Sequence, residues 1–84
     1  MTARLSEIRV WVERGVKQGA THVIIAVDRY DHDNYPVYVM PGEDARVRAV
    51  EVIQAKNMQG VDEIYNLSMD IEEQLGTRDR VCNY

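Results

Sequence analysis

The chain has few of the residues that stabilise a small protein through covalent bonds. Its 84 residues include one cysteine, Cys82, so a disulfide within the chain is excluded. A chain of this length usually gains only about 3 to 5 kcal/mol from its one hydrophobic core. Such cysteine usage is also typical of proteins from a reducing compartment. We therefore expect one domain, residues 1–84, that is supported by self-association.

The sequence also lacks a long apolar segment and an excess of basic residues. The longest apolar run, residues 23–27, has the length of a strand, whereas a membrane-spanning helix needs about 20 apolar residues. Residues 1–7 lack the charged start and apolar middle of a signal peptide. The formal net charge of −4 argues against wholesale binding to the phosphate backbone of DNA or RNA. We therefore expect a cytoplasmic protein without a membrane partner.

Apolar residues at helical spacing predict a first helix over residues 2–18. The stripe consists of Leu5, Ile8, Val12 and Val16. We expect Thr2 to cap this helix and Gly19 to end it. Gly15 costs about 1 kcal/mol relative to alanine inside a helix, which indicates a close-packing neighbour at that position.

A hairpin is predicted over residues 20–40. Residues 21–28 are rich in β-branched side chains and apolar on both faces, which is typical of the central strand of a sheet. Residues 36–40 predict a second strand that begins at Pro36. The intervening residues 28–35 predict a long loop that is rich in polar and aromatic side chains.

The second half of the chain predicts a helix, a short strand and a last helix. We expect the helix to start at Glu43, to continue to Lys56 and to present a wide apolar face: Val47, Ala49, Val50, Val52 and Ile53. Residues 61–75 fit both helical spacing and alternation; we favour a strand over 62–67 and a helix over 68–75. The polar tail, residues 76–84, is expected to be loosely ordered.

These elements predict the α+β class: a small α-β-β-α-β-α domain in which helices pack on a three-stranded sheet. A core this small, with a strand apolar on both faces and helices with broad apolar sides, leaves more hydrophobic surface than two layers bury. We therefore expect a homo-oligomer. A ligand site shared between copies would then be natural.

Metal binding and catalysis find little support in the sequence. Five candidate ligands lie close together, but their spacing matches no known metal loop: His22, Asp28, Asp31, His32 and Asp33. The chain offers no glycine-flanked nucleophilic serine, and Cys82 lies in the predicted tail, so nothing completes a catalytic triad. We predict no catalytic residue, no metal and no cofactor, with a small hydrolase acting on a nucleotide as an alternative. The hairpin aspartates are expected to shape the turn.

Aromatic and basic side chains predict a site for a nucleotide-derived ligand. Tyrosine rings can stack on a base, and arginine side chains can bind phosphates. The alternative is that the tyrosines are half-buried core residues and the arginines a solvated helix face. The predicted ligand-binding residues are Arg29, Tyr30, His32, Tyr35 and Tyr38 from the hairpin, with Arg46, Lys56 and Asn57 from the following helix.

Several segments also resemble one family. Residues 19–22, Asp28 and residues 33–39 resemble the signature of small uncharacterised proteins of phages and bacteria. Residues 56–59 and 65–68 are similar to that family's second half, so the resemblance covers roughly residues 11–75. Family members tend to read Cys-Asp-Thr-Phe-Asp at one place, where this chain has Val27, Asp28, Arg29, Tyr30 and Asp31.

The resemblance implies a phage accessory protein in the cytoplasm of a host cell. Small phage proteins of that kind include inhibitors of host defence, some of which oligomerise and sequester cyclic-nucleotide immune signals. The function expected from it is therefore non-enzymatic sequestration of a nucleotide-derived second messenger. The alternative is an adaptor or inhibitor that docks on a host protein through its acidic surface.

Overall fold

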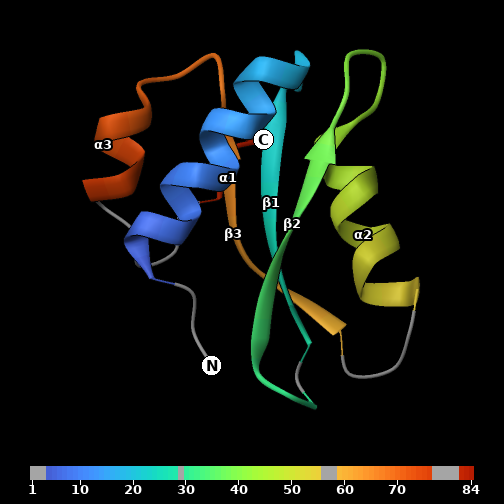
Figure 1. Cartoon of the computed structure of the whole chain (residues 1–84). Helices are drawn as coiled ribbons and strands as arrows, with labels where there is room; N and C mark the ends of the chain where they lie inside the picture. The colour runs from blue at the N-terminus through green and yellow to red at the C-terminus, as the bar shows by residue number, and fades with distance from the viewer. Residues whose placement is uncertain (1–3, 29, 56–58, 77–81) are drawn as a thin grey trace.

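The protein alternates helices and strands in the predicted order (Figure 1). The computed structural model describes residues 4–28, 30–55, 59–76 and 82–84. Within these ranges the elements are α1 (Leu5–Gln18), β1 (His22–Asp28), β2 (Asp33–Val39), α2 (Ala45–Ala55), β3 (Gln59–Asn66) and α3 (Ile71–Gly76). The predicted α+β class and element order are confirmed.

The three strands form an antiparallel sheet in the order β2-β1-β3, so β1 is the central strand. His22 lies opposite Val39 of β2 and opposite Asn66 of β3. The register between β1 and β3 shifts after Ile25, where Asp62 is the extra residue of a β-bulge. Sequence alternation in β3 therefore changes faces at the bulge.

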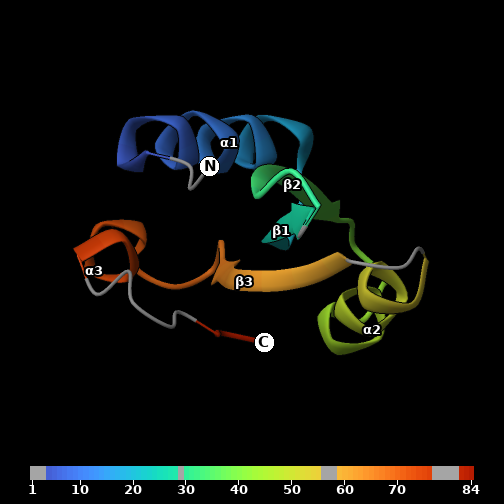
Figure 2. The same cartoon turned by 90° about the horizontal axis from the view of Figure 1, so that it is seen from below.

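Helices cover both faces of the sheet, with α1 on one side and α2 on the other (Figure 2). Val23 and Ile25 of β1 pack in one buried cluster with Ile8 and Val12 of α1. The alternate β1 residue Ile24 packs in a second cluster, with the alanines of α2. These two clusters confirm that β1 is a central strand with apolar side chains on both faces.

The predicted eight-residue hairpin loop is wrong, because the second strand begins earlier. Asp28 pairs with Asp33, so only residues 29–32 connect the strands. Asn34 is held in β2, where its side-chain amide donates to the Ala26 carbonyl (3.2 Å) and to the Asp62 carboxylate (2.8 Å). Pro36 lies inside β2 rather than at its start, which an edge strand tolerates because proline lacks only a backbone donor.

Two helix starts also differ from the prediction. α1 begins at Leu5 with Arg4 as the N-cap, whereas the predicted cap, Thr2, lies outside the described residues. α2 begins at Ala45 because the Asp44 carboxylate accepts the backbone N–H of Arg46 at 2.8 Å, the geometry of an N-cap. The predicted helix end at Gly19 is confirmed, since this residue has a left-handed φ of 78°.

β3 confirms the strand interpretation of the ambiguous segment, although it begins at Gln59. α3 begins at Ile71 rather than residue 68, because the Asp70 carboxylate accepts the backbone N–H of Glu73 at 3.0 Å. Of the predicted tail, residues 77–81 lie outside the described part of the chain. Residues 82–84 lie along the outer edge of β3, where the Asn83 N–H donates to the Ile64 carbonyl at 3.0 Å.

The buried side chain of Gln74 attaches α3 to the end of β3. Its Oε1 accepts the backbone N–H of Asn66 at 2.8 Å, and its Nε2 donates to the carbonyl of the same residue at 2.9 Å. Asn83 donates to the same Oε1 at 3.0 Å. The amide thus bonds to Asn66 as a neighbouring strand would.

Across the described ranges, no helix combines the length and apolar character that crossing a bilayer requires.

The expected close neighbour of Gly15 is also present. A Cβ atom at this position would lie 2.8 Å from Cγ2 of Val23 and 3.1 Å from Cδ1 of Leu67. Val23 is fully buried in the central strand and is β-branched, so it has little freedom to move aside. Glycine is therefore required here for close packing between α1 and the sheet.

Gly15→Ala is expected to lower the free energy of unfolding by about 1 to 2 kcal/mol, because overpacking exceeds the gain in helix propensity. Urea denaturation followed by circular dichroism measures the change. Gly76→Ala is the matched control, since a Cβ there meets open space, and its stability should stay within about 0.5 kcal/mol of the original. A Gly15→Ala variant as stable as the control would contradict the packing described.

Candidate functional site

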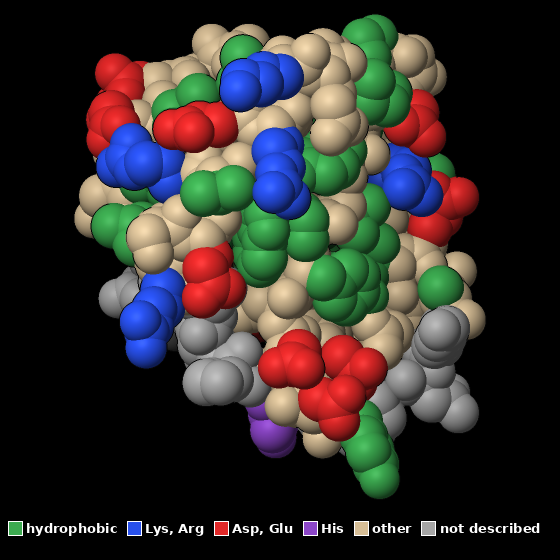
Figure 3. All heavy atoms as spheres, in the orientation of Figure 1, with side chains coloured by type: hydrophobic (Ala, Val, Ile, Leu, Met, Phe, Trp, Pro, Cys, Tyr) green, Lys and Arg blue, Asp and Glu red, His purple; other side chains and the backbone are tan. Residues whose placement is uncertain are grey.

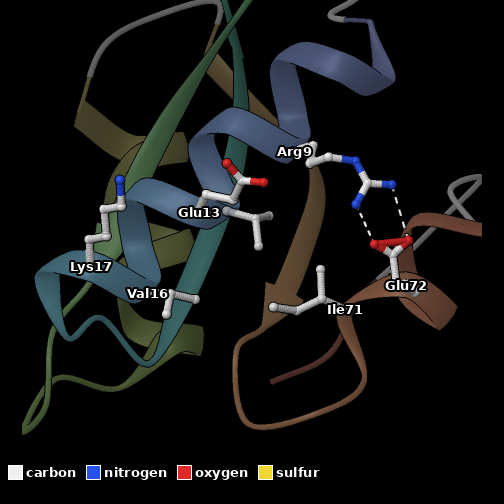
Figure 4. A pocket seen from close by; sticks show the side chains of 7 residues that line it. Arg9, Glu13, Val16, Lys17, Ile71 and Glu72 are labelled. Carbon is white, nitrogen blue, oxygen red and sulfur yellow. Dashed lines mark hydrogen bonds and ion pairs between the residues drawn. The ribbon is translucent and has the colours of Figure 1, made fainter.

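A groove lies between α1 and α3, and the two helices form its two walls (Figure 4). Its volume is about 380 Å³, within the range of roughly 300 to 1,000 Å³ common for ligand sites. Two elements far apart in the sequence supply its lining: Arg9, Val12, Glu13, Val16 and Lys17 from α1, and Ile71 and Glu72 from α3.

The floor of the groove is apolar. Val12 is buried against the sheet, Ile71 packs against the same cluster, and Val16 is 53% exposed. Val12 and Val16 lie one helical turn apart, so both face the side of α1 on which α3 packs. α3 is only six residues long, which leaves this part of the apolar stripe of α1 uncovered.

An ion pair between the two helices closes one end of the groove. The Arg9 guanidinium donates to both carboxylate oxygens of Glu72, with Nη2 3.1 Å from Oε2, and Figure 4 shows the two groups facing one another. This hydrogen bonding lowers the pKa of Glu72 and raises the pKa of Arg9. Both side chains are exposed, so solvent screens the pair and it positions the rim more than it stabilises the fold.

A second, more polar hollow of about 360 Å³ lies at the opposite end of β1 from the hairpin. It is lined by His22, Glu43, Asp44, Ala45, Arg46 and Tyr84. The guanidinium carbon of Arg46 lies 4.7 Å from the centre of the Tyr84 ring, within the range of a cation–π interaction. A hydrogen bond with Cys82 raises the pKa of Tyr84.

The His22 side chain is fixed at one of its two ring nitrogens. Its Nδ1 lies 2.9 Å from the Thr21 hydroxyl oxygen, which in turn lies 3.2 Å from the Val39 carbonyl oxygen. Nε2 is buried and has no hydrogen-bond partner among the described residues.

The predicted ligand-binding residues that the structure describes do not lie in one place. Tyr30, which is 80% exposed, and His32, with a φ of 59°, lie in the hairpin connection. Arg46 lies near His22 at the other end of β1, and a seven-residue strand spans roughly 20 Å. Three further predicted residues lie outside the described residues: Arg29, Lys56 and Asn57.

Tyr35 and Tyr38 point to opposite faces of the sheet. Tyr38 packs against the cluster under α1, and its pKa is raised by burial. The Tyr35 hydroxyl donates to the side-chain carbonyl of Gln59 on β3, and its pKa is raised by burial and then by the Asp28 carboxylate. Their hydroxyls therefore cannot contact one compact ligand.

Acidic side chains gather at the hairpin end of the molecule, as Figure 3 shows at its lower edge. The Asp28 carboxylate accepts the backbone N–H of Tyr30 at 2.9 Å, as in an Asx turn. His22 and Asp28, considered together as metal ligands because they share a strand face, lie at opposite ends of β1. In the described part of the chain, no group of three or more His, Cys, Asp or Glu residues is placed to hold a metal ion.

The sequence patterns do not predict the groove or any of its lining residues as a binding site. Arg9, Glu13 and Lys17 follow one another at four-residue spacing, a pattern that is also typical of a solvated helix face. The spacing indicates that they form one row, but the sequence contains no local indication that α3 packs beside that row. The neighbouring Val16 is the one signal of an apolar surface there.

Replacing Arg9 with Gln should raise the pKa of Glu72 towards its ordinary value, because the principal cause of the lowering is the bond from Arg9. In the original chain the pKa of Glu72 is lower in the folded state than in the unfolded state. The ion pair therefore adds stability at pH values above the ordinary carboxyl pKa. This stability is lost as the pH falls through the lowered value. NMR titration of the Glu72 carboxyl carbon measures the change. Lys17→Gln, at the other end of the groove, is the control and should leave the titration unaltered.

Comparisons with known proteins give no indication of the function. No family model, no curated protein and no solved structure matches this chain. The resemblance to small phage and bacterial proteins, which is based on the hairpin segments and two later segments, stays a prediction.

Proposed function

We propose that the protein is a non-enzymatic binding protein that recognises an amphipathic helix of another polypeptide in the α1–α3 groove. The observation that carries the proposal is the apolar floor of Val12, Val16 and Ile71 inside a charged rim. Apolar side chains of a partner helix would fill the floor, and this contact would remove Val16 from water. The lining residues offer apolar packing and charge, the two features by which a groove recognises an amphipathic helix.

The shape and charges of the groove favour a helix over a compact ligand. From Arg9 to Lys17 the rim extends for about 12 Å, more than two helical turns. Along it the charge alternates, because acidic Glu13 lies between the two basic side chains. A complementary helix has apolar residues at three- and four-residue spacing and flanking acidic and basic residues four positions apart.

Selection from a library of amphipathic helical peptides tests this proposal. The recovered peptides should share the apolar spacing and the flanking charges, and they should bind with Kd values in the micromolar range. In fluorescence anisotropy titrations, Val16→Glu should weaken a recovered peptide at least about tenfold, since the glutamate would be desolvated on the groove floor.

Val47→Glu on α2 is the matched control, because Val47 is 56% exposed and lies on the other side of the sheet. It should leave peptide affinity unchanged. If no peptide is enriched, or if the two variants weaken binding equally, the groove is not the binding site.

A second candidate function, binding of a nucleotide-derived ligand, is favoured by the His22 hollow. Arg46 combines a cation with the flat surface of Tyr84 beside the unpartnered Nε2 of His22. A phosphate would bind to Arg46, and the polar edge of a base would form hydrogen bonds with Nε2 of His22 and with the carboxylates of Glu43 and Asp44. Sequestration of a cyclic-nucleotide signal in a phage-infected host is the biological form of this candidate.

Calorimetric titration with a panel of cyclic di- and trinucleotides tests the second candidate. Binding of at least one compound at micromolar concentration is expected, with a loss of at least about tenfold in Arg46→Ala because the phosphate contact is removed. Arg14→Ala, on α1, is the control and should bind normally. If none of the compounds binds, this candidate function is wrong, and the groove proposal is unaffected.

A further inference from the structure

α2 is apolar on two sides, although the sheet covers only one of them. Ala45, Ala49 and Val52 are buried against β1 and β3. On the outer side Val47 is 56% exposed and Val50 is 50% exposed. A helix that is apolar on both sides normally has a partner on both sides.

The charges beside these two valines follow the pattern of a parallel helix pair. If Val47 and Val50 are positions a and d of a heptad, Arg46 is position g and Glu51 is position e. These four residues, with Gln54, line one shallow hollow on the outer side of α2. The basic and acidic side chains thus lie on opposite flanks of the same apolar stripe.

We propose that α2 packs in parallel against α2 of a second copy of this chain, about a two-fold axis parallel to the helices. Val47 and Val50 then contact the same two residues of the second copy. The rotation places the basic flank of each helix beside the acidic flank of the other, so each Arg46 faces Glu51 of the other copy. Antiparallel packing would instead place flanks of the same charge together.

The second copy is the occupant that this charge pattern favours, because the stripe and its flanks are complementary to themselves. α2 has 11 residues and is about 16 Å long, so the contact is smaller than a standard interface of about 1,600 Å². We therefore expect a weak dimer that forms as the concentration rises. The surface lies across the sheet from the α1–α3 groove, so this inference is independent of the proposed helix binding there, whereas it shares Arg46 with the second candidate site.

Sedimentation velocity of the full chain from about 10 µM to about 1 mM tests the dimer. The average mass should rise from that of one chain towards that of two. Val50→Glu should stay monomeric at all concentrations, because it would bury two carboxylates against each other. Val16→Glu is the control with a similarly exposed valine, and it should dimerise like the original chain. A monomeric original chain, or loss of the dimer in the control, overturns the proposal.

Charge reversal separates the parallel pair from any other contact through α2. Arg46→Glu and Glu51→Arg should each be monomeric alone, since each places like charges opposite one another. An equimolar mixture of the two should dimerise, because both Arg–Glu contacts are restored in the mixed pair. Circular dichroism of each variant confirms that it is folded. A mixture that stays monomeric while the original chain dimerises overturns the parallel arrangement.

Discussion

The rest of the structure depends on one constraint, which is that β1 carries apolar side chains on both of its faces. Neither face tolerates water, so the short chain must supply a helix to each. With α1 on one side and α2 on the other, little sequence remains to cover the helices themselves. The apolar groove beside Val16 and the outer valines of α2 both result from this shortage. The surfaces available for recognition are therefore consequences of how the core is built.

Features that depend on local pattern could be predicted from the sequence. The apolar patterns of α1 and β1 predict a helix and a strand, as the structure has them. Gly15 lies where a side chain would clash with the sheet, and Gly19 lies where the backbone is left-handed. The hairpin boundary could not be predicted, because polar residues such as Asp33 and Asn34 are typical of loops as well as of edge strands. The bulge at Asp62 likewise has no sequence signal, and it moves Val61 onto the α2 side of the sheet.

The binding residues were harder to predict than the fold, since they depend on how distant segments meet. Proximity in sequence suggested one cluster around the hairpin, yet Tyr35 and Tyr38 are an odd number of residues apart in one strand and so face opposite ways. Arg46 follows a turn at the far end of the sheet. The groove requires the packing of α3 beside α1, and periodicity within either helix does not contain that information.

The attachment of α3 through Gln74 has a consequence for the energetics of recognition. A six-residue helix has almost no stability of its own, so it persists through the Gln74 amide and the buried Leu75. Opening of this segment would remove one wall of the groove while the sheet stayed folded, as in sub-global unfolding. A ligand of the proposed kind would bind only the closed form, so its binding and the closure of α3 would be thermodynamically linked. Slower amide exchange along α3 would therefore accompany occupancy of the groove.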